Sequence, residues 1–218
     1  MGLEEYLSEI AEHIVSELQP ILKIKAVTAN TDLLGKYTEA AIRNLVIRIV
    51  QPMRVSTGAV LDYPLGNPLR QIDLIIWAPF PAPALFDVEG FGLVPKSSAF
   101  GVIEIKRSNY KGVDQKFEEF IADVRACRIV AEPRATIQDF SGSPGIGIIC
   151  ILDKKPTGKL NTLIQKKEVL AIFEKKGGKI IVRPKDVLEL INFLHFITWR
   201  YRVQGSQPVP LKINTNNL

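Results

Sequence analysis

Apolar residues recur at every third or fourth position in several stretches of the chain, which is the spacing of one face of an α-helix. This pattern predicts helices over residues 3–18, 35–50, 113–130, 160–173 and 185–201. Pro20 and Pro52 end the first two helices, because proline cannot continue a helix and disfavours helical backbone in the residue before it. Residues 21–30 lack this spacing, and we expect them to be irregular.

Shorter runs rich in β-branched and other apolar residues predict strands over residues 54–62, 71–77, 100–106, 146–152 and 179–182, with an edge strand in the tail at 209–213. Residues 63–68 are a turn by composition, so the first two strands form a hairpin. Four prolines interrupt the connection 78–98, which excludes long regular structure there. It is either a stiff excursion that packs on the body of the protein or a flap that grips a substrate.

This order of helices and strands predicts an α/β fold in which a mixed β-sheet core is flanked by α-helices. With 218 residues, of which 46% are hydrophobic, the chain can bury a substantial core. We expect a single domain over residues 1–218, with an N-terminal helical extension over about 1–34 and a C-terminal helix plus tail over about 185–218.

The formal net charge of +5 permits an anionic partner without requiring one. The first residues lack a basic region followed by an apolar run, and no stretch approaches the roughly 18 apolar residues of a membrane span. We therefore expect a cytoplasmic protein without a membrane partner. In that setting Cys127 and Cys150 are free packing thiols.

Three charged residues interrupt two of the apolar strands: Asp73 in the strand 71–77, and Glu104 and Lys106 in the strand 100–106. Side chains alternate between the two faces of a strand, so Glu104 and Lys106 point to one side and Ile103 and Ile105 to the other. Because consecutive strands usually pair, Asp73 can join them. We expect the three charged side chains to meet at an edge of the sheet.

Such a pair of carboxylates suits Mg²⁺, which prefers oxygen ligands and takes one or two carboxylates from a protein. The alternative is a surface salt bridge, of Glu104 with Lys106 or of Asp73 with Arg70, worth at most about 1 kcal/mol. We favour the metal site, because a carboxylate within an apolar strand is costly to leave unpaired. Residues 157–159 (Thr-Gly-Lys) are similar to part of a phosphate loop, but Leu160 follows the lysine where that loop has serine or threonine, and no glycine stands five residues before Gly158. We interpret them as a helix start.

Asp73 followed by Glu104-Ile105-Lys106, after a helix that carries Glu39, resembles the PD-(D/E)xK nuclease superfamily. The surrounding sequence is similar to a branch of that superfamily whose members include bacterial anti-phage effector endonucleases of the NucC type. The similar segments are residues 58–62 (GAVLD), 70–76 (RQIDLII), 93–95 (LVP) and 102–106 (VIEIK), with Thr38-Glu39 on the preceding helix. The resemblance is closest over residues 35–116.

This resemblance implies a restriction-endonuclease-like fold and a metal-dependent endonuclease that hydrolyses double-stranded DNA, with Mg²⁺ as the cofactor and Mn²⁺ as a substitute. Asp73 and Glu104 would bind the metal, together with the main-chain carbonyl of Ile105. Lys106 would orient or deprotonate the attacking water, or stabilise the charge of the transition state. Glu39 would be an outer or second-metal ligand; its alternative role is a carboxylate in the first turns of a helix, where the helix dipole favours it.

Four cations near this site are candidate contacts for DNA phosphates, or else solvated surface charges: Arg43, Arg107, Lys111 and Lys116. Gln115 would orient the substrate or Lys106, unless it is simply a helix-surface glutamine. The resembling effectors further imply antiviral defence, a homo-oligomer and a nucleotide activator, to which we assign no residues. The alternative function is a catalytically silent module with a nuclease fold that binds nucleic acid or acts as a regulatory or oligomerisation protein.

Overall fold

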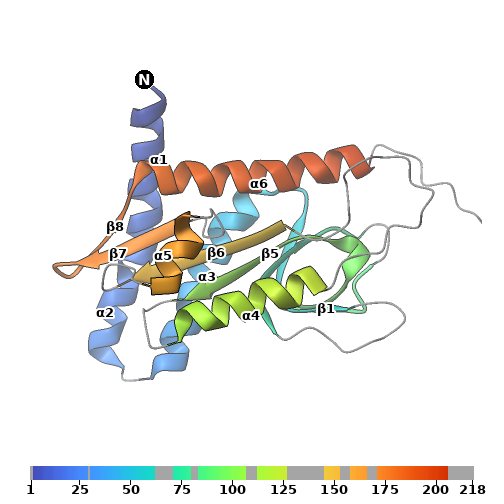
Figure 1. Cartoon of the computed structure of the whole chain (residues 1–218), viewed down its shortest axis with the longest axis horizontal. Coiled ribbons are helices and arrows are strands. Elements are labelled where there is room, and N and C mark those ends of the chain that lie inside the picture. The colour runs from blue at the N-terminus through green and yellow to red at the C-terminus, as the bar shows by residue number, and fades with distance from the viewer. Residues whose placement is uncertain are drawn as a thin grey trace, which may run out of the picture.

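An eight-stranded mixed β-sheet forms the centre of the computed structural model, and helices cover both of its faces (Figure 1). The structure describes residues 2–28, 30–61, 71–79, 83–106, 112–126, 145–152, 158–165 and 171–205. The strands are β1 (Arg54–Leu61), β2 (Ile72–Trp77), β3 (Phe86–Val88), β4 (Phe91–Pro95), β5 (Ala99–Lys106), β6 (Gly145–Leu152), β7 (Ala171–Lys176) and β8 (Lys179–Val182). Within these residues, their order across the sheet is β3-β4-β1-β2-β5-β6-β7-β8. The α/β fold predicted from the sequence is confirmed.

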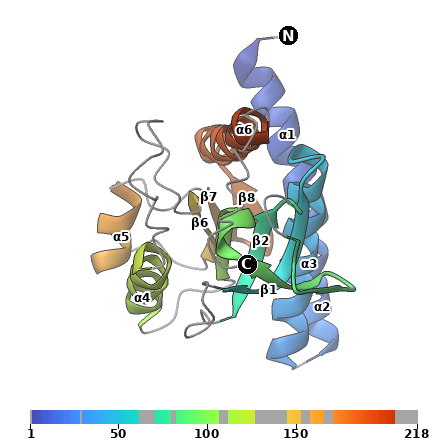
Figure 2. The same ribbon diagram turned by 90° about the vertical axis from the view of Figure 1, so that its right-hand side faces the viewer.

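Helices lie in layers on the two faces of this sheet (Figure 2). Their bounds are α1 (Leu3–Leu18), α2 (Pro20–Val27), α3 (Thr31–Ile49), α4 (Val113–Ala126), α5 (Gly158–Gln165) and α6 (Pro184–Gly205), with the short 3₁₀ turn η1 (Lys96–Ser98) before β5. Apolar residues of α1, α3 and α6 pack on one face, whereas those of α4 and α5 pack on the other. None of the helices in the described ranges combines the length and the apolarity that a membrane crossing needs.

The two strands that carry the candidate charges are neighbours. β2 pairs antiparallel with both β1 and β5, and Leu74 lies opposite Ile103 in the register. On its other side β5 pairs with β6, and β6 with β7, both in parallel. The antiparallel pairing of β1 with β2 is therefore confirmed, while the turn expected at 63–68 lies outside the described residues. The expected position of the charges at a sheet edge is wrong, because β5 is an interior strand.

The first helix is part of the core. Leu7, Ile14 and Leu18 on α1 are buried in the same apolar cluster as Leu45 of α3 and Leu194 of α6. The spacing that predicted this helix therefore marks the face that packs on the rest of the chain. On the opposite face Phe117 and Phe120 of α4 are fully buried, and β6 between the two layers is apolar on both sides, as its sequence predicts.

Two of the expected secondary-structure assignments are wrong, those of residues 21–30 and 160–173. Residues 21–27 are helical and not irregular, because Pro20 begins α2 at a position where its missing N–H is not needed. Of the helix expected over 160–173, residues 160–165 belong to α5, residues 166–170 lie outside the described chain, and residues from 171 onward form β7. For β7, pairing with a neighbouring strand outweighs the local pattern. In the connection 78–98 the described residues form only short elements, as its prolines predict: β3 has three residues and β4 five, and β4 pairs in parallel with β1.

Two further expectations concern the cysteines and the C-terminal tail. Cys150 is a buried free thiol on β6, and burial raises its pKa to about 12, which agrees with a packing role. Cys127 and the tail strand expected at 209–213 lie outside the described residues.

Candidate active site

The side chains of Asp73, Glu104 and Lys106 meet where β2 and β5 run side by side. Oδ2 of Asp73 accepts a hydrogen bond of 2.7 Å from the main-chain N–H of Ile105. Nζ of Lys106 donates to Oε1 of Glu104 at 2.5 Å, which also makes the two an ion pair. Two carboxylates and one ammonium group therefore share one short segment of the sheet.

The alternation of β5 explains why Glu104 and Lys106 lie together. Ile103 and Ile105 belong to the apolar cluster under α1, α3 and α6, whereas Val102 belongs to the cluster under α4. Glu104 and Lys106 share the face of Val102 because they are two and four residues further along the strand. Glu104 is 6% exposed, whereas the side chain of Lys106 is 22% exposed, so the carboxylate is buried and the ammonium is partly open to solvent.

Burial is also the main influence on Asp73. Burial, followed by the negative charge of Glu104, raises the pKa of the Asp73 carboxyl from an ordinary value of 3.8 to about 7. The ammonium of Lys106 and the N–H of Ile105 act in the opposite direction but do not cancel these effects. Without a cation, the site therefore binds a proton near neutral pH.

Glu39 reaches the same site from α3. The side chain of Asn30 caps this helix by accepting from the N–H groups of Asp32 and Leu33, so α3 begins at Thr31 and Glu39 is well beyond its first turn. The interpretation of Glu39 as a carboxylate in the first turns of the helix is therefore wrong. Burial raises the pKa of Glu39, and the charges of Lys106 and Glu104 shift it in opposite directions. Glu39 is thus in electrostatic range of both residues.

The donor set at this site fits Mg²⁺. In the part of the chain that the structure describes, no three His, Cys, Asp or Glu side chains are arranged to hold one metal ion together. Asp73 and Glu104 provide two carboxylates, which is the number that Mg²⁺ commonly takes from a protein before water and substrate complete its coordination. A cation between them would offset the repulsion that raises the pKa of Asp73.

The remaining candidates are less closely associated with this centre. Gln115 donates to Oε1 of Glu119 at 2.9 Å, and Lys116 forms an ion pair of 3.5 Å with the same glutamate, so both side chains have a partner on the surface of α4. Arg43 lies on α3 and lines a pocket beside Glu39. Arg107 and Lys111 lie outside the described residues.

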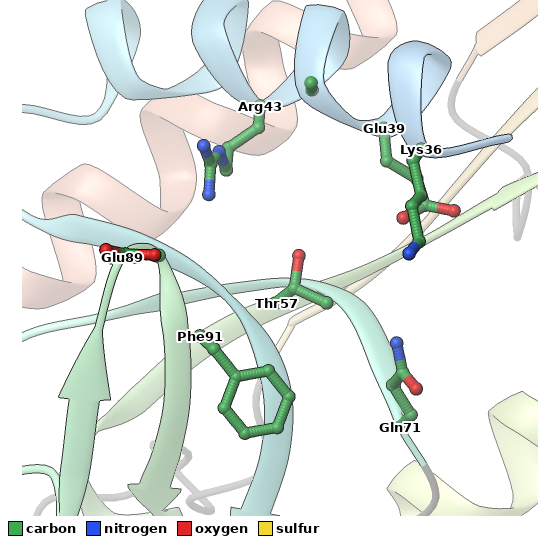
Figure 3. A pocket seen from close by; sticks show the side chains of 9 residues that line it. Lys36, Glu39, Arg43, Thr57, Gln71, Glu89 and Phe91 are labelled. Atoms are coloured by element: carbon green, nitrogen blue, oxygen red, sulfur yellow. The ribbon is translucent and has the colours of Figure 1, made fainter. Parts of the chain in front are cut away.

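This pocket includes residues that the sequence analysis did not identify. It has a volume of about 350 Å³ and brings side chains from α3 together with Thr57, Gln71, Glu89 and Phe91 (Figure 3). The sequence does contain one signal for this pocket: Lys36, Glu39 and Arg43 are spaced by three and four residues and therefore share one face of a helix. The other residues come from separate strands and turns, and no local spacing relates them.

Comparison with known proteins shows that solved structures share the fold of this chain. No protein-family model matches the sequence, and a search of curated proteins gives no match either. Among solved structures, NucC from P. aeruginosa ATCC27853 in its cAAA-bound form is 17% identical with a TM-score of 0.64, over 91% of this chain and 92% of that one.

NucC from E. coli MS115-1 is similar in two forms. The cAAA-bound form is 14% identical with a TM-score of 0.62, over 91% of both chains. The apo form is 16% identical with a TM-score of 0.54, over 97% of this chain and 95% of that one. At these identities the likeness concerns the fold alone: nearly the whole chain has a fold similar to that of NucC.

Proposed function

We propose that this chain is a Mg²⁺-dependent endonuclease that hydrolyses phosphodiester bonds of double-stranded DNA. The observation that carries the proposal is the junction of β2 and β5, where Asp73 is hydrogen-bonded to the main chain of Ile105 next to the ion pair of Glu104 and Lys106. Two carboxylates beside an ammonium group match the needs of phosphodiester hydrolysis, and the NucC-like fold supports the same function.

The residues of the site divide the chemistry among them. Asp73 and Glu104 would hold Mg²⁺, or Mn²⁺ in its place, with the main-chain carbonyl of Ile105 as a further oxygen and Glu39 as an outer ligand. When bound, the metal supplies charge neutralisation on the phosphate and lowers the pKa of water. Lys106 brings a positive point charge, which orients the attacking water or stabilises the charge that develops on the phosphoryl oxygens.

The proposal extends to regulation and assembly. Two of the similar NucC structures contain cAAA, and this supports a nucleotide activator for a defence effector of this fold. We include in the proposal that this chain is a homo-oligomer that responds to such a nucleotide. Light scattering after size-exclusion chromatography, with and without cAAA, would test the assembly. A monomer in both conditions would contradict this part of the proposal.

A plasmid assay tests the catalytic part. Purified protein is incubated with supercoiled plasmid and Mg²⁺ or Mn²⁺, with and without cAAA, against EDTA and against Glu104→Ala. We expect nicked and linear products from the wild type, and a loss of about 100-fold or more in rate for the variant. Lys179→Ala serves as a control, because it removes an exposed cation near β8 at the other end of the sheet.

Two outcomes would go against this proposal. Cleavage that survives both EDTA and Glu104→Ala would exclude the assigned mechanism. Binding of DNA without cleavage under every metal and activator would instead support a catalytically silent module of the same fold.

A further inference from the structure

A second feature lies directly beside the candidate active site: the 350 Å³ pocket between α3 and the turn that joins β3 to β4 (Figure 3). We propose that this pocket binds the nucleotide next to the scissile phosphate in the cleaved DNA strand. Its phosphate binds to Arg43 and Lys36, and its sugar packs on Phe91. The inference rests on the proposed function, since it names how the substrate of that same site is held.

The pocket and the active site are connected by short hydrogen bonds. Oγ1 of Thr57 donates to the main-chain oxygen of Asp73 at 2.8 Å, and the N–H of Thr57 donates to the oxygen of Gly90 at 2.7 Å. One residue of β1 thus ties the strand of Asp73 to the turn that forms the far wall of the pocket. Glu39 lines the pocket and is also in range of Glu104 and Lys106. A ligand in the pocket would therefore lie next to the reacting centre.

Arg43 is placed by packing against this turn. Its guanidinium lies so close to Gly90 that a Cβ atom there would come within 2.0 Å of Nη1. Gly90 has a φ of +81°, which glycine adopts without strain. In the described residues the buried Nε of Arg43 has no hydrogen-bond partner, and no ion pair involves its guanidinium. An arginine held in this way keeps its guanidinium at the lining of the pocket, where its remaining donors suit an anion.

The lining suits a nucleotide better than an isolated anion. Lys36 and Arg43 reach from α3 toward the sheet in Figure 3, and they are the two cations of the pocket. The two carboxylates are Glu39 and Glu89, of which Glu39 is near the metal-binding pair and Glu89 is exposed at the turn. Phe91 is 43% exposed and adds an apolar face. A phosphate between the cations, with the adjoining sugar on the ring, uses each of these chemistries.

The size of the pocket agrees with one nucleotide unit. Its volume of about 350 Å³ is near the lower end of the range for sites that bind small molecules. Glu89 would weaken binding of the phosphate, because both carry a negative charge. Removing the charge of Glu89 should therefore raise the affinity for DNA, whereas removing that of Arg43 should lower it.

The first experiment measures DNA binding without cleavage. A fluorescein-labelled duplex is titrated with the Glu104→Gln protein in EDTA, and the association constant is followed against NaCl concentration. Adding Arg43→Ala or Lys36→Ala should each reduce the slope of log K against log [NaCl] by about 1, with a loss in affinity of about 3–10-fold. Glu89→Gln should tighten binding, and Phe91→Ala should weaken it without changing the slope.

Control variants separate binding from folding. Arg43→Lys keeps the charge and should retain the slope, which guards against the case in which Arg43→Ala fails to fold. Lys179→Ala removes a cation far from the pocket and should change neither slope nor affinity. Thermal unfolding of every variant shows whether each is folded at the assay temperature.

The second experiment places the phosphate. Duplexes with a single uncharged methylphosphonate on either side of the cleaved bond are given to the wild type with Mg²⁺. We expect one of the two substitutions to reduce kcat/KM by about tenfold in the wild type and to have little further effect in Arg43→Ala. Full additivity at both positions would overturn the inference.

The outcomes distinguish the two proposals. If the wild type cleaves DNA and Glu104→Ala does not, but the salt slope of Arg43→Ala and Lys36→Ala is unchanged, the pocket does not bind a phosphate and the proposed function stands. If cleavage ignores EDTA and Glu104→Ala, the proposed function fails whatever the slopes are. A Glu104→Gln protein that does not bind DNA overturns the pocket assignment.

Discussion

At the scale of single residues, the environment of Asp73 couples the binding of a cation to the release of a proton from its carboxyl group. Its carboxylate is fixed by the N–H of Ile105 and lies close enough to Glu104 for the two charges to repel each other. Burial strengthens this repulsion because less water screens it. A cation that binds between the carboxylates must therefore displace a proton near neutral pH, which couples metal binding to pH.

The same pKa shift predicts a pH dependence of stability in the absence of metal. Burial raises the pKa of Asp73 from 3.8 to about 7 on folding, so between these values the folded chain binds more protons than the unfolded chain. The contribution of Asp73 to the free energy of unfolding therefore falls as the pH rises from about 4 to about 7. Asp73→Asn should flatten the profile measured by urea denaturation in EDTA. Equal slopes for the two proteins would contradict the assignment.

The ion pair of Glu104 and Lys106 allows a second prediction. Lys106→Met takes the ammonium away from a carboxylate that is 6% exposed and should lower the free energy of unfolding by about 1–3 kcal/mol. Adding Glu104→Gln should recover most of this loss, because the buried charge is removed as well. Urea denaturation of both single variants and the double variant gives the coupling. Strictly additive effects would show that the two side chains do not depend on each other.

At the scale of elements, one side chain adds hydrogen bonds between the N-terminal helices and the far edge of the sheet, where α1 also packs its apolar face on β8. Nε2 of Gln19 donates to the oxygen of Gly178 at 3.0 Å, and Oε1 of Gln19 accepts from the N–H of Ile180 at 3.0 Å. Gln19 lies between α1 and α2, and both main-chain partners belong to the β7–β8 hairpin. The amide replaces the hydrogen bonds that a neighbouring strand would provide to β8.

Gln19→Ala should therefore destabilise the protein by about 1–2 kcal/mol, because it leaves main-chain groups of the hairpin without this partner. The control is Asn192→Ala on the exposed side of α6, which should change stability by less than about 0.5 kcal/mol. Thermal and urea denaturation measure both. Equal stability of the two variants would show that the hairpin is held without Gln19.

At the scale of the whole molecule, the candidate active site lies where separate layers meet. β2 and β5 supply its central residues, α3 supplies Glu39 from one layer, and the turn between β3 and β4 closes the adjoining pocket. A ligand of this site therefore binds only the folded chain. By linkage, such a ligand stabilises the protein as a whole.

Mg²⁺ should accordingly raise Tm by about 3–6 °C when its free concentration is about tenfold above Kd. The shift should be absent in the double variant Asp73→Asn/Glu104→Gln and preserved in Lys179→Ala. Differential scanning fluorimetry against EDTA measures it. A shift of the same size in the double variant would place the bound ion elsewhere.

Much of this site could be predicted from the sequence, for a local reason. The two-residue period of a strand puts Glu104 and Lys106 on the same face and separates them from Ile103, whatever the rest of the chain does. The continuous apolar run of β6 likewise predicts burial on both faces, and Pro20 predicts the end of α1. These features depend on neighbouring residues only.

Tertiary structure decided the rest. The strand state of residues 171–176 follows from pairing with β6 and β8, and the parallel pairing of β4 with β1 follows from the sheet order. The approach of Glu39 to Lys106 and the pocket around Arg43 join segments that are tens of residues apart. Sequence alone determined which residues are chemically equipped for the site. Only the packing of layers determined which of them meet, because long-range contacts are selected by burial and strand pairing over the whole chain.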